Sequence, residues 1–407
     1  MNIWCISKYA SPPSYSKVPA RLFTLTKEFN NLGHNAILLT SDSNHLANFP
    51  DTKEVYNWEN MDRVFVCWIK TKKYIKTASI ARILSWFDFE RKLFSLPKAK
   101  LAKPDVVIVS SLSILSILYG YYLKKKYKSF LVLEVRDIWP LTMTEEGGFS
   151  KIHPLVLFLS WIEKFGYKNS DLVVGTMPRL DLHVKNILGY DKPFFCSPLG
   201  FNPDNYEDNL KSFINPFNEK FPKDKIVIGY AGSMGITNAL EPFIESIQLL
   251  KDNTNIHFML VGSGALKDKF ELELEKFKNV TFLPRMEQNQ VKYFLDKCDI
   301  LYLSTQDSLV WKYGQSMNKI VEYMLAAKPI IASYTGYPSM VNEANCGKFI
   351  KTIDPIDIKN AIEDIVDLSI EDRIALGKNG KKWIYQNRQY SLLAKDYIKK
   401  IESLKND

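Results

Sequence analysis

The sequence has few cysteines, and their spacing suggests neither a structural metal site nor a set of disulfides. The five cysteines are odd in number and scattered, with no Cys-x-x-Cys pair. Structural zinc sites and disulfide-rich secreted domains both need closely and regularly spaced cysteines. This scarcity argues against both classes and predicts a reducing compartment.

The chain also lacks a hydrophobic run long enough to span a bilayer. Its longest apolar run extends from Leu112 to Leu123, whereas a spanning helix needs about 20 residues. The N-terminal stretch MNIWCIS is short and is followed at once by KYASPPS, so it predicts a first β-strand rather than a signal peptide. These absences predict a cytoplasmic protein in which 112–123 forms a core helix.

A complete dinucleotide-binding motif is missing as well. The glycine turns GYAGSMG and VGSGALK each follow an apolar segment, but neither completes Gly-x-Gly-x-x-Gly. In the second turn Lys267 occupies the third position after Gly262 and Gly264. A lone Gly-x-Gly after a strand is weak evidence for a nicotinamide cofactor, and we predict no cofactor.

Composition and the order of apolar segments predict two α/β domains. With 407 residues, 46% hydrophobic and 24% charged, the chain can bury two cores and does not have a disordered composition. Short apolar segments alternate with helical ones, as in a parallel sheet with helices on both faces. A segment rich in Asn, Asp and Pro interrupts this series, which then restarts. We predict a first domain over 1–205, a linker over 206–224 and a second domain over 225–382.

One basic segment carries much of the net charge of +9. From Lys70 to Lys103, ten Lys and Arg face only Asp88 and Glu90. Basic residues mixed with large aromatics suit an anionic membrane surface. A basic patch alone also fits nucleic acid, although no nucleic-acid motif is present, and a solvated helix face with some core aromatics is a further alternative. The interleaved aromatics are Trp68, Tyr74, Trp86, Phe87, Phe89 and Phe94.

The stretch from Leu309 to Ala332 predicts a helix whose start can bind an anion. Ser316 is a good N-cap residue ahead of the apolar run that begins at Ile320, so we expect the helix to begin near Met317. The free amides of a helix start and the helix dipole favour phosphate. A phosphate there would meet Ser316, Met317, Asn318 and Lys319, and Glu322 follows at a distance suited to ribose hydroxyls.

The same stretch resembles a known donor-site signature. The run EYMLAAKPIIAS, with Gly336 and YPSMVNEANCGKFI after it, is similar to that of glycosyltransferase family 4, whose members are retaining enzymes of the GT-B fold. In that family two Glu residues eight positions apart flank the helix start, and the second holds the ribose. Glu322 matches the second and Gly314 stands at the first, as in a bacterial polysaccharide subgroup. The alternative is an ordinary capped helix of an α/β domain.

The resemblance implies a donor site with one further departure from the family. The GSMG turn, with Ser233, Met234 and Gly235, stands where the family usually carries an Arg and, shortly after it, a Lys for the diphosphate. Neither is present, so the cation would have to come from elsewhere in the second domain. The candidates are Arg285, Lys312 and Lys319. The helical pattern over 383–404 resembles the family's last helix, which crosses back to the first domain.

Two loops of the first domain would face the acceptor and the sugar. The carboxyl ends of parallel strands gather at one edge of a sheet, where such folds bind ligands. At one strand end stand Arg136 and Asp137, where the family often has a His-Asp pair; a buried ion pair that closes the strand is the alternative. Asp137 and Glu322 are the candidate catalytic residues. The loop after the first strand contributes Ser14, Tyr15, Ser16, Lys17 and Arg21.

The resemblance implies a retaining glycosyltransferase of hexosyl or N-acetylhexosaminyl type. It would move an N-acetylated or deoxy hexose from a nucleotide diphosphate, with UDP favoured, to a lipid-linked saccharide. The enzyme would act in the synthesis of a bacterial surface polysaccharide such as O-antigen or capsule. It would associate peripherally with the inner face of the cell membrane. The chain contains no Asp-x-Asp metal clip, and a helix dipole with Lys or Arg can replace a divalent ion, so we predict no metal.

Two other functions stay open at this stage. A sugar-nucleotide 2-epimerase shares the GT-B fold but needs acid and base groups in the cleft, and only His153 among the five histidines follows a plausible cleft loop. A catalytically inactive protein that binds a sugar nucleotide or a lipid is suggested by Gly314 and by the missing Arg and Lys.

Overall fold

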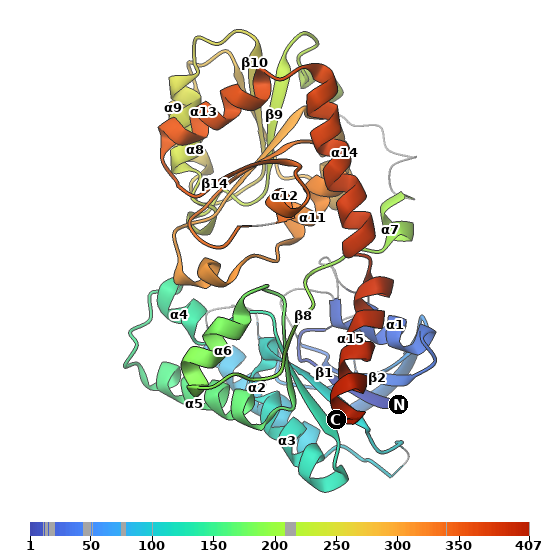
Figure 1. Ribbon diagram of the computed structural model, residues 1–407. Helices are drawn as coiled ribbons and strands as arrows, with labels where there is room; N and C mark the ends of the chain where they lie inside the picture. Colours follow the sequence, from blue (N-terminus) through green and yellow to red (C-terminus); the bar gives the residue numbers. More distant parts are fainter. Residues whose placement is uncertain are drawn as a thin grey trace. The chain divides into compact units, whose positions relative to one another are not determined.

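The computed structural model describes residues 1–10, 12, 15, 21–43, 50, 52–74, 79–99, 101–207, 217–338 and 340–406. The chain divides into two compact units, which are described separately (Figure 1). Unit 1 comprises Met1–Pro198 and Tyr390–Asp407, and unit 2 comprises Leu199–Gln389. The division falls a few residues before the predicted domain boundary at 205, and residues 208–216 of the predicted linker lie outside the described residues.

Unit 1 is built on an eight-stranded sheet in the order β3-β4-β2-β1-β5-β6-β7-β8. All neighbouring strands are parallel except the β3–β4 pair. The inner strands are mainly apolar because both of their faces are covered. The strands are β1 Asn2–Ile6, β2 Asn35–Ser41, β3 Tyr56–Met61, β4 Val64–Ile69, β5 Val106–Ser110, β6 Phe130–Val135, β7 Leu172–Gly175 and β8 Phe194–Cys196.

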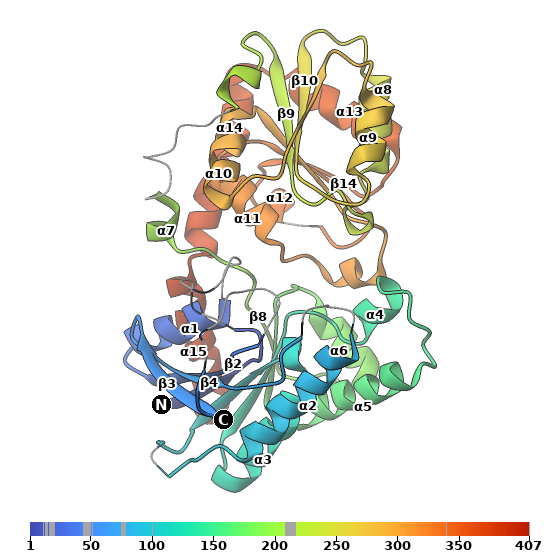
Figure 2. The same ribbon diagram turned by 180° about the vertical axis from the view of Figure 1, so that it is seen from behind.

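Helices cover both faces of this sheet. The helices α1 (Arg21–Asn31) and α15 (Tyr390–Asn406) lie side by side in Figures 1 and 2 and share a core with one face. On the other face Gly120 of α3 and Gly166 of α5 lie against strand side chains, where an added Cβ would come within 2.8 and 2.9 Å of leucine methyl groups. The remaining bounds are α2 Ile80–Phe94, α3 Ser116–Tyr127, α4 Leu141–Glu145, α5 Pro154–Asn169 and α6 Leu180–Leu188.

Unit 2 contains a fully parallel six-stranded sheet in the order β11-β10-β9-β12-β13-β14. The order reverses between β9 and β12, and the loops that leave two strands at such a switch point form a natural ligand crevice. The strands are β9 Ile226–Ala231, β10 Ile256–Val261, β11 Val280–Leu283, β12 Ile300–Ser304, β13 Ile330–Ser333 and β14 Gly347–Ile350.

Two helix layers enclose the second sheet. The side chains of α8, α9 and α13 form one core with it, and those of α10, α11, α12 and α14 form the other. The predicted pair of doubly wound α/β units is therefore confirmed. The bounds are α7 Pro203–Glu207, α8 Glu241–Leu249, α9 Lys267–Leu274, α10 Gln288–Lys297, α11 Asn318–Leu325, α12 Met340–Glu343, α13 Pro355–Val366 and α14 Ile370–Asn387.

The C-terminal segment predicted as one helix over 383–404 is two helices. The first, α14, ends at Asn387 in unit 2, and α15 begins at Tyr390 in unit 1. Between them Gln389 forms a parallel bridge with Phe201, and the Phe201 amide donates to the Arg388 carbonyl at 3.0 Å. The two passages of the chain between the units are thereby joined. Among the described residues, no helix is both long and apolar enough to cross a membrane.

Candidate functional site

The start of α11 presents backbone amides without a side-chain cap. Met317 is the N-cap residue and makes no side-chain cap hydrogen bond. The prediction of Ser316 as the cap is wrong, because its hydroxyl accepts a hydrogen bond from the Leu199 amide at 2.8 Å instead. The first amides of a helix have no partner within the helix. An anion at this end would therefore face the turn that begins at Asn318, one residue later than expected.

The Lys319 side chain folds back onto the loop that follows β9, residues 232–239, here called the β9 loop. Its Nζ donates to the Tyr230 hydroxyl at 3.2 Å and to Asn238 Oδ1 at 3.1 Å, and lies 4.4 Å from the Tyr230 ring centroid. A Cβ at Gly232 would lie 2.7 Å from this nitrogen, so the glycine leaves the space that the ammonium occupies. Burial lowers the pKa of Lys319 to about 8, against the opposing charge of Glu322.

The β9 loop holds the three predicted donor residues in different environments. Ser233 is exposed and its carbonyl accepts a hydrogen bond from Tyr230 at 2.7 Å. Met234 is buried, and its amide and carbonyl bond to Ser263 and Leu266. Met234 therefore belongs to the core, and Ser233 and Gly235 are the residues of this turn that remain to contact a ligand.

The two glycine turns of unit 2 pack backbone to backbone. A Cβ at Gly262 would lie 1.8 Å from the Gly232 carbonyl oxygen, and one at Gly264 would lie 2.4 Å from the Met234 carbonyl oxygen. Real Cβ atoms do not approach so closely. Close packing of the loops after β9 and β10 thus accounts for the incomplete Gly-x-Gly pattern, without a dinucleotide.

Glu322 lies one turn further along α11, facing α10. Its side chain is partly exposed, and Gln288 Nε2 donates to Oε1 at 3.4 Å. Desolvation raises the pKa of Glu322, while Gln288 and the Lys292 and Lys319 ammonium groups oppose that shift. Lys292 is buried with its Nζ 4.8 Å from the Tyr206 ring centroid. The carboxylate thus stands at a partly exposed position where the charges of Lys292 and Lys319 favour its ionised form.

Of the three predicted cations, Lys319 alone is placed at the β9 loop by a contact between described residues. Arg285 and Lys312 are both exposed. Arg285 follows β11, and Lys312 lies on the short 3₁₀ turn Leu309–Tyr313 before α11. The structure therefore favours Lys319 as the replacement for the missing Arg and Lys of the family pattern.

A buried amide that the sequence did not single out stands beside Gly314. Gln315 is only 7% exposed, and neither its side-chain nitrogen nor its oxygen has a hydrogen-bond partner among the described residues. Trp311 Nε1 and Thr305 Oγ1, in the same connection from β12 to α11, are also buried without one. Unsatisfied buried polar groups are costly, so these are candidates for ligand contact. The only sequence signal was that Gln315 adjoins the position of the family's first Glu.

In unit 1, Arg136 and Asp137 follow β6 and are held by Ser111 at the end of β5. The Ser111 hydroxyl accepts from the Arg136 amide at 3.0 Å and donates to the Asp137 carbonyl at 3.1 Å. Asp137 is exposed, Arg136 is partly exposed, and no ion pair joins them in the described part of the chain. The alternative of a buried ion pair is therefore wrong.

The loop after β1 fits its predicted role only in part. Ser14, Ser16 and Lys17 lie outside the described residues, and Tyr15 is half-buried against Trp68 with ring centroids 5.5 Å apart. Arg21 is fully buried, so the prediction that it contacts a ligand is wrong.

The Arg21 guanidinium is used inside unit 1 instead. It donates to the Pro198 carbonyl at 2.6 Å and to the Ser197 hydroxyl at 2.9 Å, and pairs with Glu134 at 3.4 Å. These bonds tie α1 to β6 and to the end of the β8 segment.

Lys8, for which the sequence predicts no role, is buried two residues after the end of β1. Its Nζ donates to the Ser43 carbonyl at 2.5 Å and lies 5.0 Å from the Tyr9 ring centroid. Burial lowers the pKa of Lys8 to about 7, although the Asp42 carboxylate opposes the shift. The feature of the sequence that could have indicated Lys8 is its position shortly after the first strand. No group of three His, Cys, Asp or Glu side chains among the described residues is placed to hold a metal ion.

Comparison with known proteins gives a match over most of the second unit. Residues 212–383 match the family model described as glycosyl transferases, group 1. Gln315, Lys319 and Glu322 all lie within the matched segment. A search of curated protein sequences found no match to the chain.

Solved structures of low sequence identity share the fold over nearly the whole chain. Sucrose-phosphate synthase from Thermosynechococcus elongatus is 16% identical with a TM-score of 0.70, covering 99% of this chain and 98% of its own. The E. coli trehalose-6-phosphate protein bound with UDP-2-fluoro glucose is 11% identical with a TM-score of 0.72, covering 98% and 99%. Anabaena HepE in complex with UDP and glucose is 13% identical with a TM-score of 0.63, covering 99% and 100%. The fold is GT-B, with two Rossmann-like domains.

Proposed function

We propose that the protein is a retaining glycosyltransferase of the family 4 type. It transfers a hexose or N-acetylhexosamine from a UDP-sugar to a lipid-linked saccharide in bacterial polysaccharide synthesis. The observation that carries the donor side is the Lys319 ammonium held against the β9 loop beside the uncapped start of α11. Cation, helix dipole and free amides there converge on one anion-binding region. Two of the structural neighbours are described as bound with UDP or a UDP-sugar.

The reaction assigns a physical role to each group. Negative charge grows on the departing diphosphate, and Lys319 together with the first amides of α11 stabilises it without a divalent ion. Glu322 accepts hydrogen bonds from the ribose hydroxyls. Neither Asp137 nor any other group is an obvious nucleophile, so we propose that the bond to the acceptor forms on the face of the sugar that the diphosphate leaves. Asp137 and Arg136 then orient the acceptor.

We also propose that the 70–103 segment binds an anionic membrane surface. Within it, α2 exposes Ile80, Leu84 and Phe87 at helical spacing and ends with the basic Arg91 and Lys92. Such a face suits the headgroup region of a bilayer. Two of the aromatics predicted for this role, Trp68 and Phe89, are instead buried in the core.

One experiment separates the proposed function from its alternatives. The protein is incubated with radiolabelled UDP-sugars and a polyprenyl-diphosphate-linked saccharide, and the products are separated by chromatography. We expect label in the lipid fraction with the anomeric configuration retained. An epimerised donor would instead identify an epimerase, and tight nucleotide binding with unchanged donor and acceptor would identify an inactive binding protein.

A further inference from the structure

Unit 1 contains an apolar cavity at the end of its sheet that the donor chemistry does not use. The cavity has a volume of about 620 Å³ and is lined by residues of α2, α4, the loop after α4 and the start of α5. Pockets of roughly 300 to 1,000 Å³ take one medium-sized organic ligand. Its apolar walls include Ile83, Trp86, Trp139, Met143, Phe149 and Leu155.

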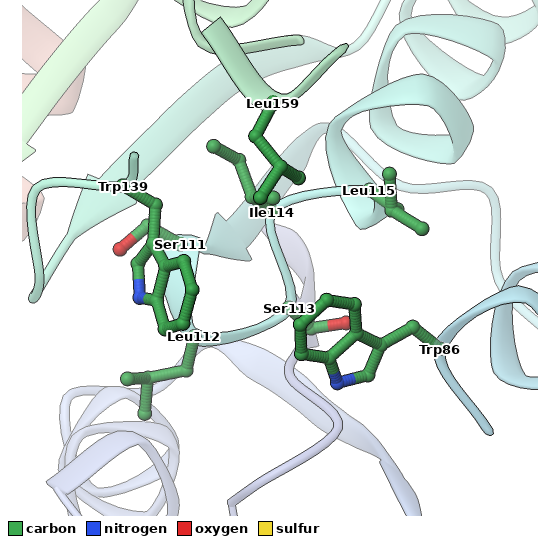
Figure 3. A pocket seen from close by; sticks show the side chains of 8 residues that line it. All are labelled: Trp86, Ser111, Leu112, Ser113, Ile114, Leu115, Trp139 and Leu159. Atoms are coloured by element: carbon green, nitrogen blue, oxygen red, sulfur yellow. The ribbon is translucent and has the colours of Figure 1, made fainter. Parts of the chain in front are cut away.

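Two indoles form the inner wall. Trp86 of α2 and Trp139, which follows β6, meet edge to face with ring centroids 6.1 Å apart. Figure 3 shows them on either side of the turn that begins at Ser111, where a second pocket of about 10 Å³ has space for only one water molecule. The indoles therefore close the cavity at this end, and a ligand must enter from the surface.

The cavity adjoins a strongly apolar surface. On its wall Ile80 is 76% exposed, and on the loop between α4 and α5 Ile152 is 81% exposed. Phe87 of α2 stacks on Phe158 of α5 at 6.3 Å, and Phe158 on Trp161, which is 55% exposed. Apolar and aromatic side chains exposed together mark a contact surface.

Two charged side chains line the cavity, Arg82 and Glu146, and Arg82 can pair with the anionic end of a ligand. Arg82 lines the cavity, with its guanidinium 5.6 Å from the Trp86 ring centroid and Nε 3.4 Å from the Tyr9 hydroxyl. Trp139 also stands two residues after Asp137, so the cavity adjoins the strand end assigned to the acceptor. A chain in the cavity would thus have its phosphate near Arg82, and its saccharide would extend toward the strand end that carries Asp137.

We propose that this cavity binds the hydrocarbon chain of the lipid that carries the acceptor, with the lipid phosphate near Arg82. The inference rests on the proposed function for the identity of the lipid as acceptor. The apolar walls remove the chain from water, and each buried CH₂ strengthens binding by roughly fourfold. The exposed apolar surface beside the cavity lets the chain pass from a bilayer without crossing water.

Direct binding measurements test this proposal. The full-length protein is titrated in a calorimeter with farnesyl phosphate, dodecyl phosphate and isopentenyl phosphate, each below its micelle-forming concentration. We expect at least tenfold tighter binding of a long-chain phosphate than of isopentenyl phosphate. The preference between farnesyl and dodecyl chains then names the class of lipid. Equal affinities for all three phosphates would overturn the proposal.

Filling the cavity provides the matched comparison. I83W is expected to weaken farnesyl phosphate binding at least tenfold while UDP affinity stays at the parent value, since UDP is assigned to unit 2. L32W, at an exposed leucine outside the cavity lining, serves as the control. If I83W does not fold, as judged by its thermal unfolding, L155W replaces it.

Different results would overturn the cavity proposal and the proposed glycosyltransferase function. Parent-like farnesyl phosphate affinity in a folded cavity-filling variant overturns the cavity proposal. This holds even if its binding to anionic vesicles falls, because the cavity would then serve only membrane contact. A protein that binds long-chain phosphates but transfers no sugar to any acceptor would contradict the proposed function alone.

Discussion

Glu322 and Lys319 lie three residues apart on α11, and the charge of each favours the ionised form of the other. Burial acts in the opposite direction on both. The pair can therefore respond to a ligand, since a diphosphate at the helix start favours the ammonium and ribose hydroxyls favour the carboxylate. The proposed donor chemistry depends mainly on these two residues.

Replacing Glu322 tests the ribose contact. Loss of one hydrogen bond to a charged group costs about 1.5 to 3 kcal/mol, so we expect E322A to raise the Kd for UDP by about 10- to 150-fold with little change in thermal stability. Calorimetric titration measures the Kd. E343A, at an exposed carboxylate of α12 in the same unit, is the control and should bind UDP like the parent. Unchanged affinity in E322A would refute the assignment of Glu322.

Lys319 predicts a pH dependence of donor binding. Its pKa of about 8 lies below the ordinary value of 10.5, and a bound diphosphate would raise this pKa. Above about pH 8, where Lys319 of the free protein is deprotonated, binding of UDP therefore takes up one proton. The Kd for UDP should be constant below about pH 8 and rise by up to tenfold per pH unit above it. Titration at pH 7, 8 and 9 in buffers of different ionisation enthalpy measures both affinity and proton uptake.

K319R provides the comparison for that experiment. Arginine stays charged throughout this range, so the variant should show a flat pH dependence even if its affinity is lower. A parent protein whose UDP affinity does not change between pH 7 and 9 would show that Lys319 does not meet the diphosphate.

At the scale of elements, α14 packs against the end of α11 through glycine. A Cβ at Gly377 would lie 1.9 Å from the Ala327 carbonyl oxygen. In an isolated helix a Gly to Ala change stabilises by about 1 kcal/mol. At Gly377 we expect the same change to destabilise the protein, because the added Cβ would clash with backbone. The two segments cannot move apart without losing the core that contains Met324 and Ile384.

We therefore expect G377A to lower the free energy of unfolding of unit 2 by about 1 to 3 kcal/mol. Urea unfolding followed by circular dichroism measures the change. The matched variant G380A places its Cβ 3.0 Å from the Cys346 side chain rather than against backbone, so its effect should be smaller. A G377A protein more stable than the parent would show that this contact can relax.

At the scale of the whole molecule, the diphosphate is assigned to amides and a lysine rather than to a metal ion. Excess EDTA should then leave sugar transfer unchanged, measured with the radiolabelled donor after the protein has been dialysed against chelator. Loss of activity that manganese restores would contradict this assignment. Matched dialysis without chelator controls for inactivation by handling.

The sequence alone determined the two doubly wound units, because apolar strands buried on both faces leave a pattern that needs no knowledge of contacts. It also indicated the position of α11 and Glu322, since helix starts and carboxylates are local features. Strand order did not follow from it, nor did the switch point at β9 and β12, because pairing joins segments distant in the chain.

Only the tertiary structure decided which side chains belong to a site. Arg21 and Trp68 are of residue types that often contact ligands, but both are buried in the core. The Ser316 hydroxyl accepts a hydrogen bond from the Leu199 amide and does not cap α11. Lys319 became the proposed donor-site cation because its ammonium group donates hydrogen bonds to Tyr230 and Asn238. The burial and the hydrogen-bond partners of these side chains depend on residues far away in the sequence. Local sequence patterns therefore cannot predict them.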